Sequence, residues 1–154
     1  MPVTNKIIFI FFIFLFSSSL TFSSDILVID GDTIKIGKEK IRFSGIDAPE
    51  IHQICSQDMV DVECGKISKK ILSEKIEGKK ISCFSEGKDR YKRTLAECFV
   101  GDESLSSFLV RSGYAFAYRK YSEKFILDEE YAQSNGLGMW KMVFEFPWDY
   151  RKKN

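Results

Sequence analysis

The stretch that decides the fold is Ile26-Leu-Val-Ile-Asp-Gly-Asp-Thr-Ile-Lys-Ile-Gly-Lys-Glu-Lys-Ile-Arg-Phe43. Its first four residues form an apolar run that predicts a short buried strand, and Asp30-Gly31 is a turn signal between apolar segments. Over residues 33–36 and 39–43, apolar and polar side chains alternate, which is typical of strands with one buried face. The stretch therefore predicts a three-stranded meander.

A helix, a hairpin and further helices are expected after the meander. The expected helices are 66–77, 104–112 and 125–134, and the expected hairpin strands are 80–85 and 93–100. This order predicts an α+β fold, namely a five-stranded Greek-key β-barrel of the OB-fold type with about three helices. The aromatic tail over 144–150 is expected to pack on the barrel, and Arg151 to Lys153 to form a solvated end.

The N-terminal segment has the layout of a secretory signal peptide. A positive charge at Lys6 precedes an unbroken apolar run over residues 7–16, and small polar residues follow. We expect residues 1–24 to be removed and residues 25–154 to form one mature domain, secreted or periplasmic. The alternative is a membrane anchor, which is less favoured because the apolar stretch is shorter than the roughly 18–20 residues that span a bilayer.

The charge of the domain restricts how it can hold a polyanion. Without Lys6, the chain has 22 basic and 22 acidic residues, so the domain is formally neutral. A protein that binds nucleic acid by bulk charge is expected to be basic. Any contact with nucleic acid must therefore be local to a cleft.

Four cysteines, Cys55, Cys64, Cys83 and Cys98, predict two disulfides in an oxidising compartment. Four cysteines allow three pairings. Cys83 and Cys98 lie equally far from the middle of the predicted hairpin loop, so they face each other across antiparallel strands. This favours Cys83–Cys98 and leaves Cys55–Cys64. A zinc site is disfavoured, because the sequence has no C-x-x-C pair and His52 is its sole histidine.

Two acidic pairs flank the predicted strand ends. Asp30 and Asp32 surround a glycine between the first two strands, and Asp47 and Glu50 surround Ala48-Pro49 after the third. In a meander, the start of the second strand and the end of the third lie at the same end, so the pairs can converge. Clustered carboxylates repel each other unless a cation lies among them, and oxygen ligands suit calcium or magnesium. Each pair alone is more typical of a turn or a surface charge than of a cation site.

Two arginines accompany these carboxylates in the predicted sheet. Arg42 lies between Ile41 and Phe43, so it points away from the face that those two residues share. Arg93 begins the last predicted strand. Guanidinium groups beside a cation can hold the negative charge that develops on phosphoryl oxygens. Either arginine alone is also compatible with an exposed strand position.

In combination, these motifs resemble the staphylococcal nuclease family in content, order and spacing. They are Val28-Ile-Asp-Gly-Asp-Thr-Ile34, Ile41-Arg-Phe-Ser-Gly-Ile-Asp-Ala-Pro-Glu50, Asp89-Arg-Tyr-Lys-Arg93 and Leu109-Val-Arg-Ser-Gly-Tyr-Ala115. The resemblance implies an OB-fold enzyme that hydrolyses phosphodiester bonds of DNA or RNA. It also implies a single calcium ion, held by Asp32, Asp47 and the backbone carbonyl of Ala48.

The same resemblance implies roles for the remaining site residues. Glu50 matches the general base that activates water. Arg42 and Arg93 match the residues that bind the scissile phosphate and stabilise its five-coordinate transition state. Tyr118 and Tyr121 are candidates for stacking on bases, and core packing explains them equally well.

The sequence departs from the family pattern at several positions. Ala48 stands where threonine is usual, a change that keeps the backbone carbonyl. Lys92 stands where glycine is usual, so a left-handed backbone there would be strained and would affect Arg93. The loop over 51–63 carries acidic residues in place of lysines, which is expected to weaken the binding of long polyanions. These acidic residues are Asp58, Asp61 and Glu63.

Three functions compete for this sequence: a nuclease, a nucleic-acid-binding module without catalysis, and a domain that binds a protein or glycan partner. Asp32, Arg42, Asp47, Glu50 and Arg93 are all present. A module that merely binds phosphates has no use for carboxylates at the phosphate site, so the set favours the enzyme. We expect DNA or RNA as the partner, no obligate protein partner, membrane contact only through a retained N-terminal segment, and a monomer.

Overall fold

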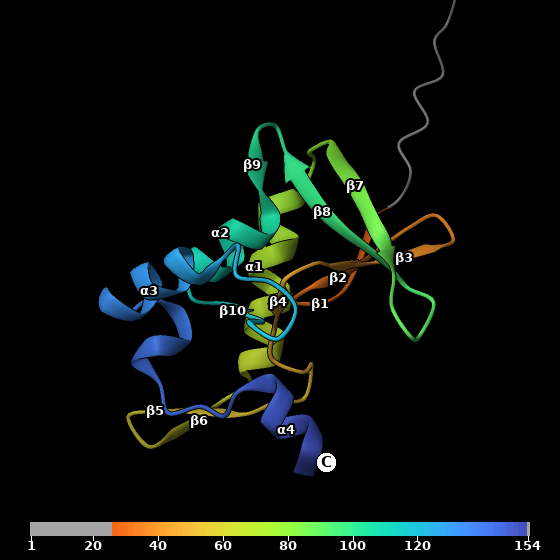
Figure 1. Cartoon of the computed structure of the whole chain (residues 1–154). Helices are drawn as coiled ribbons and strands as arrows, with labels where there is room; N and C mark the ends of the chain where they lie inside the picture. Colours follow the sequence, from red (N-terminus) through yellow and green to blue (C-terminus); the bar gives the residue numbers. More distant parts are fainter. Residues whose placement is uncertain (1–25, 154) are drawn as a thin grey trace, which may run out of the picture.

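The computed structural model of the chain describes residues 26–153 (Figure 1). The expected signal peptide, residues 1–24, lies outside the described residues. The main sheet has the strand order β1-β2-β3-β8-β7, and β9 pairs with β8. Its strands are β1 Ile26–Asp30, β2 Thr33–Ile36, β3 Glu39–Phe43, β7 Ile81–Lys88, β8 Thr94–Val100 and β9 Glu103–Ser104.

Helices and short strand pairs complete the fold. The helices are α1 Cys64–Ile76, α2 Leu105–Arg111, α3 Ile126–Ser134, the 3₁₀ helix η1 Gly138–Lys141 and α4 Pro147–Lys153. The short strands are β4 Ile46–Asp47, which pairs with β10 Phe116–Ala117, and β5 Cys55–Gln57, which pairs with β6 Val60–Val62. None of the helices among residues 26–153 is both long and apolar enough to span a membrane.

The observed architecture confirms the predicted α+β class and differs in detail. Three strands pair as a meander, and β8 then runs parallel to β3, which is the strand order of an OB-fold. Within the described residues, β1 and β7 do not pair, so the sheet is not a closed barrel. The described part also has four α-helices where about three were expected. The short strands and α4 were missed because two to seven residues carry little periodic signal.

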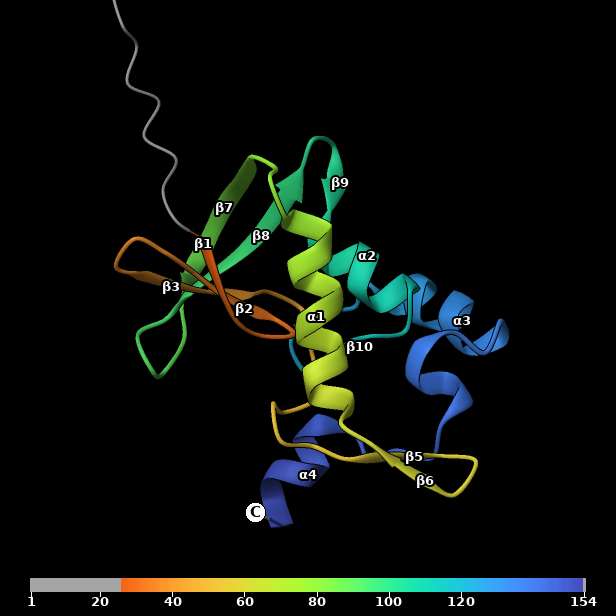
Figure 2. The same ribbon diagram turned by 180° about the vertical axis from the view of Figure 1, so that it is seen from behind.

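The main core lies between the sheet and the helices. Ile34, Ile41 and Phe43 are almost completely buried, as the alternation over β2 and β3 predicted. Leu72 of α1 and Leu109 of α2 pack into the same core. Figures 1 and 2 show α1 running alongside the sheet, with α2 and α3 beyond it. Lys35, Lys40 and Arg42 alternate with the buried residues of β2 and β3 and therefore lie on the opposite face of these strands.

A second cluster anchors the C-terminal segment. Phe116 of β10 is fully buried, and its ring contacts four aromatic rings of the tail. These rings belong to Trp140, Phe144, Phe146 and Trp148. The tail thus packs as expected, but on β10 and the neighbouring disulfide rather than on the long strands. Figure 2 shows α4 beside the β5–β6 hairpin at one end of the molecule.

Two disulfides join Cys55 to Cys64 and Cys83 to Cys98. These are the pairs that the hairpin argument favoured. Cys83 and Cys98 lie directly opposite each other in the β7–β8 register, with Cα atoms 4.0 Å apart. The Cys55–Cys64 bond connects β5 to the start of α1 and belongs to the second cluster.

Candidate active site

The turn between β1 and β2 places Asp32 at the edge of the sheet. The backbone N–H of Asp32 donates to Asp30 Oδ1 at 3.1 Å, and the β1–β2 register shifts at this turn. Glycine is required at position 31, because a Cβ on Gly31 would lie 2.0 Å from Oγ of Ser68 on α1. This close approach leaves Asp32 only 2% exposed.

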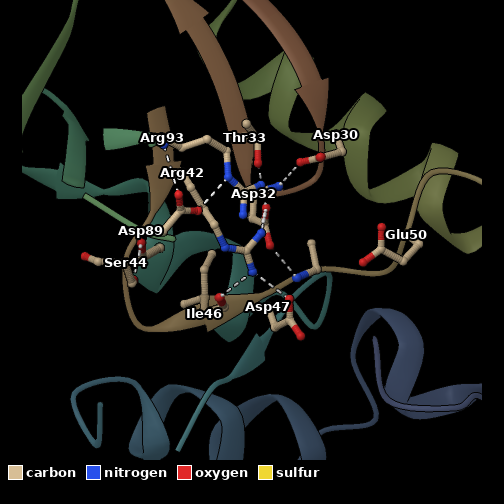
Figure 3. A network of polar contacts seen from close by, with 12 residues as sticks. Asp30, Asp32, Thr33, Arg42, Ser44, Ile46, Asp47, Glu50, Asp89 and Arg93 are labelled. Carbon is tan, nitrogen blue, oxygen red and sulfur yellow. Dashed lines mark hydrogen bonds and ion pairs between the residues drawn. The ribbon is translucent and has the colours of Figure 1, made fainter. Parts of the chain in front are cut away.

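The Arg42 guanidinium lies between two carboxylates (Figure 3). Nη1 donates to Asp32 Oδ1 and Nη2 donates to Asp47 Oδ1, each at 2.6 Å. Ile41 and Phe43 are buried on the core side of β3, so Arg42 projects from the opposite face. The two acidic motifs therefore converge at one end of the meander, as predicted.

Asp32 and Asp47 are carboxylates with little access to water. Burial raises the pKa of Asp32 above its ordinary value, although the charge of Arg42 opposes this shift. Burial also raises the pKa of Asp47, against a hydrogen bond from Arg151. Burial disfavours the charged form of Arg42, but Asp32 and Asp47 outweigh it and raise the pKa of the guanidinium. Positive charge between the aspartates thus favours their ionised forms against the effect of burial.

Glu50 follows β4 on a loop whose backbone is tightly fixed. Its N–H donates to Oε1 of the buried Gln53 at 3.1 Å, and Gln53 N–H donates to Glu50 O at 2.8 Å. A Cβ on Gly65 of α1 would lie 1.8 Å from the same Glu50 carbonyl oxygen. The Glu50 side chain is 39% exposed. Sequence reasoning missed Gln53, because a lone glutamine in a loop carries no pattern.

Arg93 is held by Asp89 at the base of the β7–β8 loop (Figure 3). Arg93 Nε donates to Asp89 Oδ2 at 2.7 Å, and the N–H groups of Tyr91 and Arg93 donate to Oδ1 at 2.8 and 2.9 Å. Lys92 has a φ of 65°, the left-handed backbone for which glycine is favoured. The Asp89 bonds on both sides of Lys92 keep Arg93 in place despite this strain.

Tyr118 and Tyr121, the candidate stacking residues, contact each other edge to face at 4.9 Å between ring centroids. Trp148 of α4 stacks on Tyr118, with 5.4 Å between centroids and 4° between the ring planes. One face of Tyr118 is therefore covered. Tyr121 is 70% exposed.

Arg151 to Lys153 were expected to form a solvated end, and all three residues are exposed, but this expectation missed the contacts of the Arg151 guanidinium. Its Nη1 and Nη2 donate to Oδ1 and Oδ2 of Asp47 at 3.1 and 2.7 Å, and Nη1 also donates to Glu50 Oε1 at 2.6 Å. The aromatic cluster on Phe116 brings α4 beside β10, which pairs with β4 and hence with Asp47. Burial opposes the charge of Arg151, but the carboxylates of Asp47 and Glu50 raise its pKa.

A pocket of about 890 Å³ brings these side chains together. Its lining includes Asp32, Arg42, Ala48, Glu50, Arg93, Tyr118, Tyr121 and Arg151. Asp47 is fully buried behind the pocket and contacts it through Arg42 and Arg151. The acidic residues expected to repel a polyanion do not line this pocket, since Asp61 borders a separate groove and Glu63 pairs with Lys66.

The donor set at this site fits a divalent cation. Carboxylate and carbonyl oxygens are the ligands that hard cations prefer. Asp32 and Asp47 both reach the Arg42 guanidinium at 2.6 Å, so they face a common point. Ala48 adjoins this point, because its N–H donates to Asp32 Oδ2 at 2.9 Å. Within the described part of the chain, no group of three or more carboxylate, histidine or cysteine side chains is arranged so that it could hold a metal ion, so a cation here would need water as further ligands.

Comparison of the sequence with known proteins identifies the family of this chain. A family model described as "Staphylococcal nuclease homologue" matches residues 40–142, which is more than half of the chain. The matched region contains Arg42, Asp47, Glu50 and Arg93, whereas Arg151 lies beyond it.

Individual relatives agree with the family model. A Haemophilus influenzae protein named "Uncharacterized endonuclease" is 36% identical over 118 residues, covering 72% of this chain and 61% of that protein. The Rhizobium meliloti "Succinoglycan biosynthesis protein ExoI" is 35% identical, covering 74% of this chain and 62% of that protein. An Escherichia coli "Uncharacterized endonuclease" is 29% identical, covering 81% of this chain and 82% of that protein. The chain thus spans about three fifths of the first two relatives, and it belongs to the staphylococcal nuclease family.

Proposed function

We propose that the protein is a calcium-dependent nuclease that hydrolyses phosphodiester bonds of DNA or RNA. The observation that carries the proposal is the convergence of carboxylates and guanidinium groups from separate segments on one pocket. These residues are Asp32, Arg42, Asp47, Glu50 and Arg93. The names of two relatives as endonucleases support the same activity.

The two arginines would bind the scissile phosphate. A guanidinium has five N–H donors. Arg42 directs Nη1 and Nη2 at the aspartates, and Arg93 directs Nε at Asp89, so further donors on both groups can contact phosphoryl oxygens. Negative charge builds on these oxygens in the transition state, so removing either guanidinium should cost about 3–4 kcal/mol of transition-state stabilisation, as for an oxyanion-hole donor.

Glu50 would take the proton from the attacking water. Its exposed carboxylate lines the pocket, and Gln53 and Gly65 fix the backbone from which it projects. General-base assistance of this kind typically contributes about 10²–10⁴ in rate. Asp32, Asp47 and the Ala48 carbonyl would hold the cation, which when bound supplies polarisation of a phosphoryl oxygen and orientation of water.

The exposed ring of Tyr121 at the pocket is suited to contact an unstacked base, so we propose single-stranded nucleic acid as the preferred substrate form. We also propose that the chain is secreted or periplasmic, with attachment to a membrane through residues 1–24 as the alternative. Two disulfides among the described residues support an oxidising compartment.

Cleavage of single-stranded DNA by the purified, oxidised protein tests the proposal. The assay compares calcium with EDTA, and a gel-shift experiment with the same oligonucleotide measures binding. Calcium-dependent cleavage is expected, with loss of cleavage in Arg42→Ala. Arg90→Ala, a change to another arginine lining the pocket, is the matched control and should retain most of the activity.

The alternative function has a distinct outcome in this assay. If the protein bound the oligonucleotide but did not cleave it at any calcium concentration, the enzyme proposal would fail. A nucleic-acid-binding module would then be the better description. If it neither bound nor cleaved, a protein or glycan ligand would replace nucleic acid as the candidate partner.

A further inference from the structure

Helix α4 contacts two residues to which the proposed function gives tasks, and it also contacts Tyr118, a candidate stacking residue. Arg151 binds Asp47, the proposed cation ligand, and Glu50, the proposed general base. Trp148 of the same helix covers one face of Tyr118, a proposed stacking residue. A side chain that merely bound substrate phosphate would not require this additional coverage of Tyr118.

Arg151 and a cation compete for the same oxygens of Asp47. Each carboxylate oxygen has about two lone-pair sites for hydrogen bonds or metal bonds. Oδ1 of Asp47 accepts from both Arg42 and Arg151, and Oδ2 accepts from Arg151. Asp47 is 0% exposed, and both lone-pair sites of Oδ1 are occupied, so a cation that binds Oδ1 must displace one of the two guanidinium groups.

Charge adds to this competition. The Arg151 guanidinium lies 2.7 Å from Asp47 Oδ2, so a divalent cation on that oxygen would lie within a few ångströms of a like charge. Such a pair repels at short range and favours release of the more mobile partner. The Arg151 side chain is 38% exposed, whereas that of Arg42 is 15% exposed. Arg151 is therefore the group that can leave into solvent.

The attachment of α4 is compatible with such a release. The start of the helix is anchored by Trp148 in the aromatic cluster, and Lys152 and Lys153 pair within the same C-terminal segment, with Asp149 and Glu145. Arg151 instead pairs with residues 101 and 104 positions earlier in the sequence. These ion pairs hold the last turn of α4 against the pocket.

We propose that Arg151 is an autoinhibitory residue that competes with the cation for Asp47, and that its release frees Glu50 and moves the last turn of α4 away from the pocket, while Trp148 stays anchored in the aromatic cluster. The inference rests on the proposed function, because it takes Asp47 as a cation ligand. It predicts that Arg151→Gln binds calcium more tightly than wild type. A factor on the order of tenfold is expected, within the roughly 5–150-fold range typical of coupled sites.

Calcium affinity of the oxidised full-length protein, measured by isothermal titration calorimetry, provides the test. Lys152→Gln is the matched control, because it removes the same charge from the adjacent position without a contact to Asp47. It should leave the affinity within about twofold of wild type, since exposed charges are screened. Arg151→Lys keeps the charge but loses the two-point contact, so an intermediate affinity is expected.

Trp148 reports on α4 directly, because it stacks on Tyr118 three positions before Arg151. Trp140→Phe isolates its fluorescence, and this change removes a buried indole N–H that has no hydrogen-bond partner among the described residues. Release of the Arg151 guanidinium, one helical turn away, should change the intensity of Trp148 emission over the concentration range in which calcium binds. An unchanged emission at saturating calcium would overturn the release of the last turn of α4.

The outcomes separate this inference from the proposed function. Tighter calcium binding in Arg151→Gln, and not in Lys152→Gln, supports the competition. Equal or weaker binding in Arg151→Gln, with calcium-dependent cleavage of DNA intact, overturns the competition alone. Absence of calcium binding in both wild type and Arg151→Gln would overturn the calcium site and the competition together.

Discussion

The Asp32 carboxylate accepts a hydrogen bond from the backbone N–H of Ala48 at 2.9 Å. This bond ties the turn between β1 and β2 to the loop after β4, so the two acidic motifs stay together even without a side chain between them. Arg42 then supplies the positive charge that two buried aspartates require. The hydrogen bond between the Ala48 N–H and the Asp32 carboxylate thus joins the two motifs, and Arg42 neutralises the charge of the aspartates.

Replacement of Arg42 by alanine should destabilise the protein strongly. The change removes the ion pairs of Arg42 with the buried carboxylates of Asp32 and Asp47. Removal of one partner of a buried ion pair typically costs about 3–5 kcal/mol. A carboxyl whose pKa is raised in the folded state makes the protein more stable as pH falls. The loss of stability in Arg42→Ala should therefore be smaller at pH 4 than at pH 7. Urea denaturation at pH 7 and pH 4 measures this. Arg90→Ala, on an exposed loop, should change stability by about 0.5 kcal/mol or less.

Addition of millimolar calcium should restore part of the stability of Arg42→Ala, because a cation can take over the neutralisation of Asp32 and Asp47. A ligand that binds the folded state stabilises it by mass action. Calcium that left the midpoint of denaturation unchanged in this variant would argue against a cation site at these carboxylates.

Asp89 should make the stability contributed by the β7–β8 loop depend on pH. Partial burial opposes ionisation, but hydrogen bonds from Arg93 and Tyr91 lower the pKa of Asp89 below its ordinary value. A carboxyl with a lowered folded-state pKa contributes stability above its unfolded pKa, about 4, and loses it as pH falls through the folded value. Asp89→Asn should therefore cost about 1–2 kcal/mol at pH 7.

The same substitution should have a smaller effect on stability at pH 2 than at pH 7, because protonation of Asp89 removes its charge in wild type as well. Denaturant unfolding of wild type and Asp89→Asn at both pH values gives the comparison. A difference of equal size at the two pH values would mean that the charge of Asp89 does not support the loop.

Lys92 stores backbone strain beside Arg93. Its φ of 65° costs an ordinary residue roughly 1–2 kcal/mol, whereas glycine adopts this region freely. Replacement by glycine relieves this strain, but the larger entropy of glycine in the unfolded chain offsets part of the relief. Lys92→Gly should therefore stabilise the protein by about 0.5–1 kcal/mol. Thermal denaturation is the measurement. Lys88→Gly, on the neighbouring strand β7, is the control and should lower the midpoint.

Much of this site could be predicted from the sequence, because short patterns of neighbouring residues indicate its main features. Alternation of apolar residues placed Arg42 on the polar face of β3, and the meander brought Asp32 and Asp47 together. The usual glycine at the position of Lys92 indicated a left-handed backbone, which the structure has. Each of these features depends on a few neighbouring residues, whose pattern and conformation are linked directly.

Arg151 could not be predicted in the same way. It lies 104 residues from Asp47, and its local context, Arg151-Lys-Lys153, is typical of a solvated basic end. Its position follows from tertiary packing of the aromatic tail on Phe116. The signal that could have found it is the density of aromatic residues just before it, because an anchored segment fixes the charged residue that follows.

The most direct test of the account is the single-turnover rate of single-stranded DNA cleavage in calcium by wild type, Glu50→Gln and Glu86→Gln. Both glutamates line the pocket, but Glu86 lies on β7 rather than on the loop that follows Asp47, and it serves as the control. The account predicts that Glu50→Gln slows cleavage by about 10²–10⁴ and that Glu86→Gln slows it by less than about tenfold. Equal rates for wild type and Glu50→Gln would contradict the account.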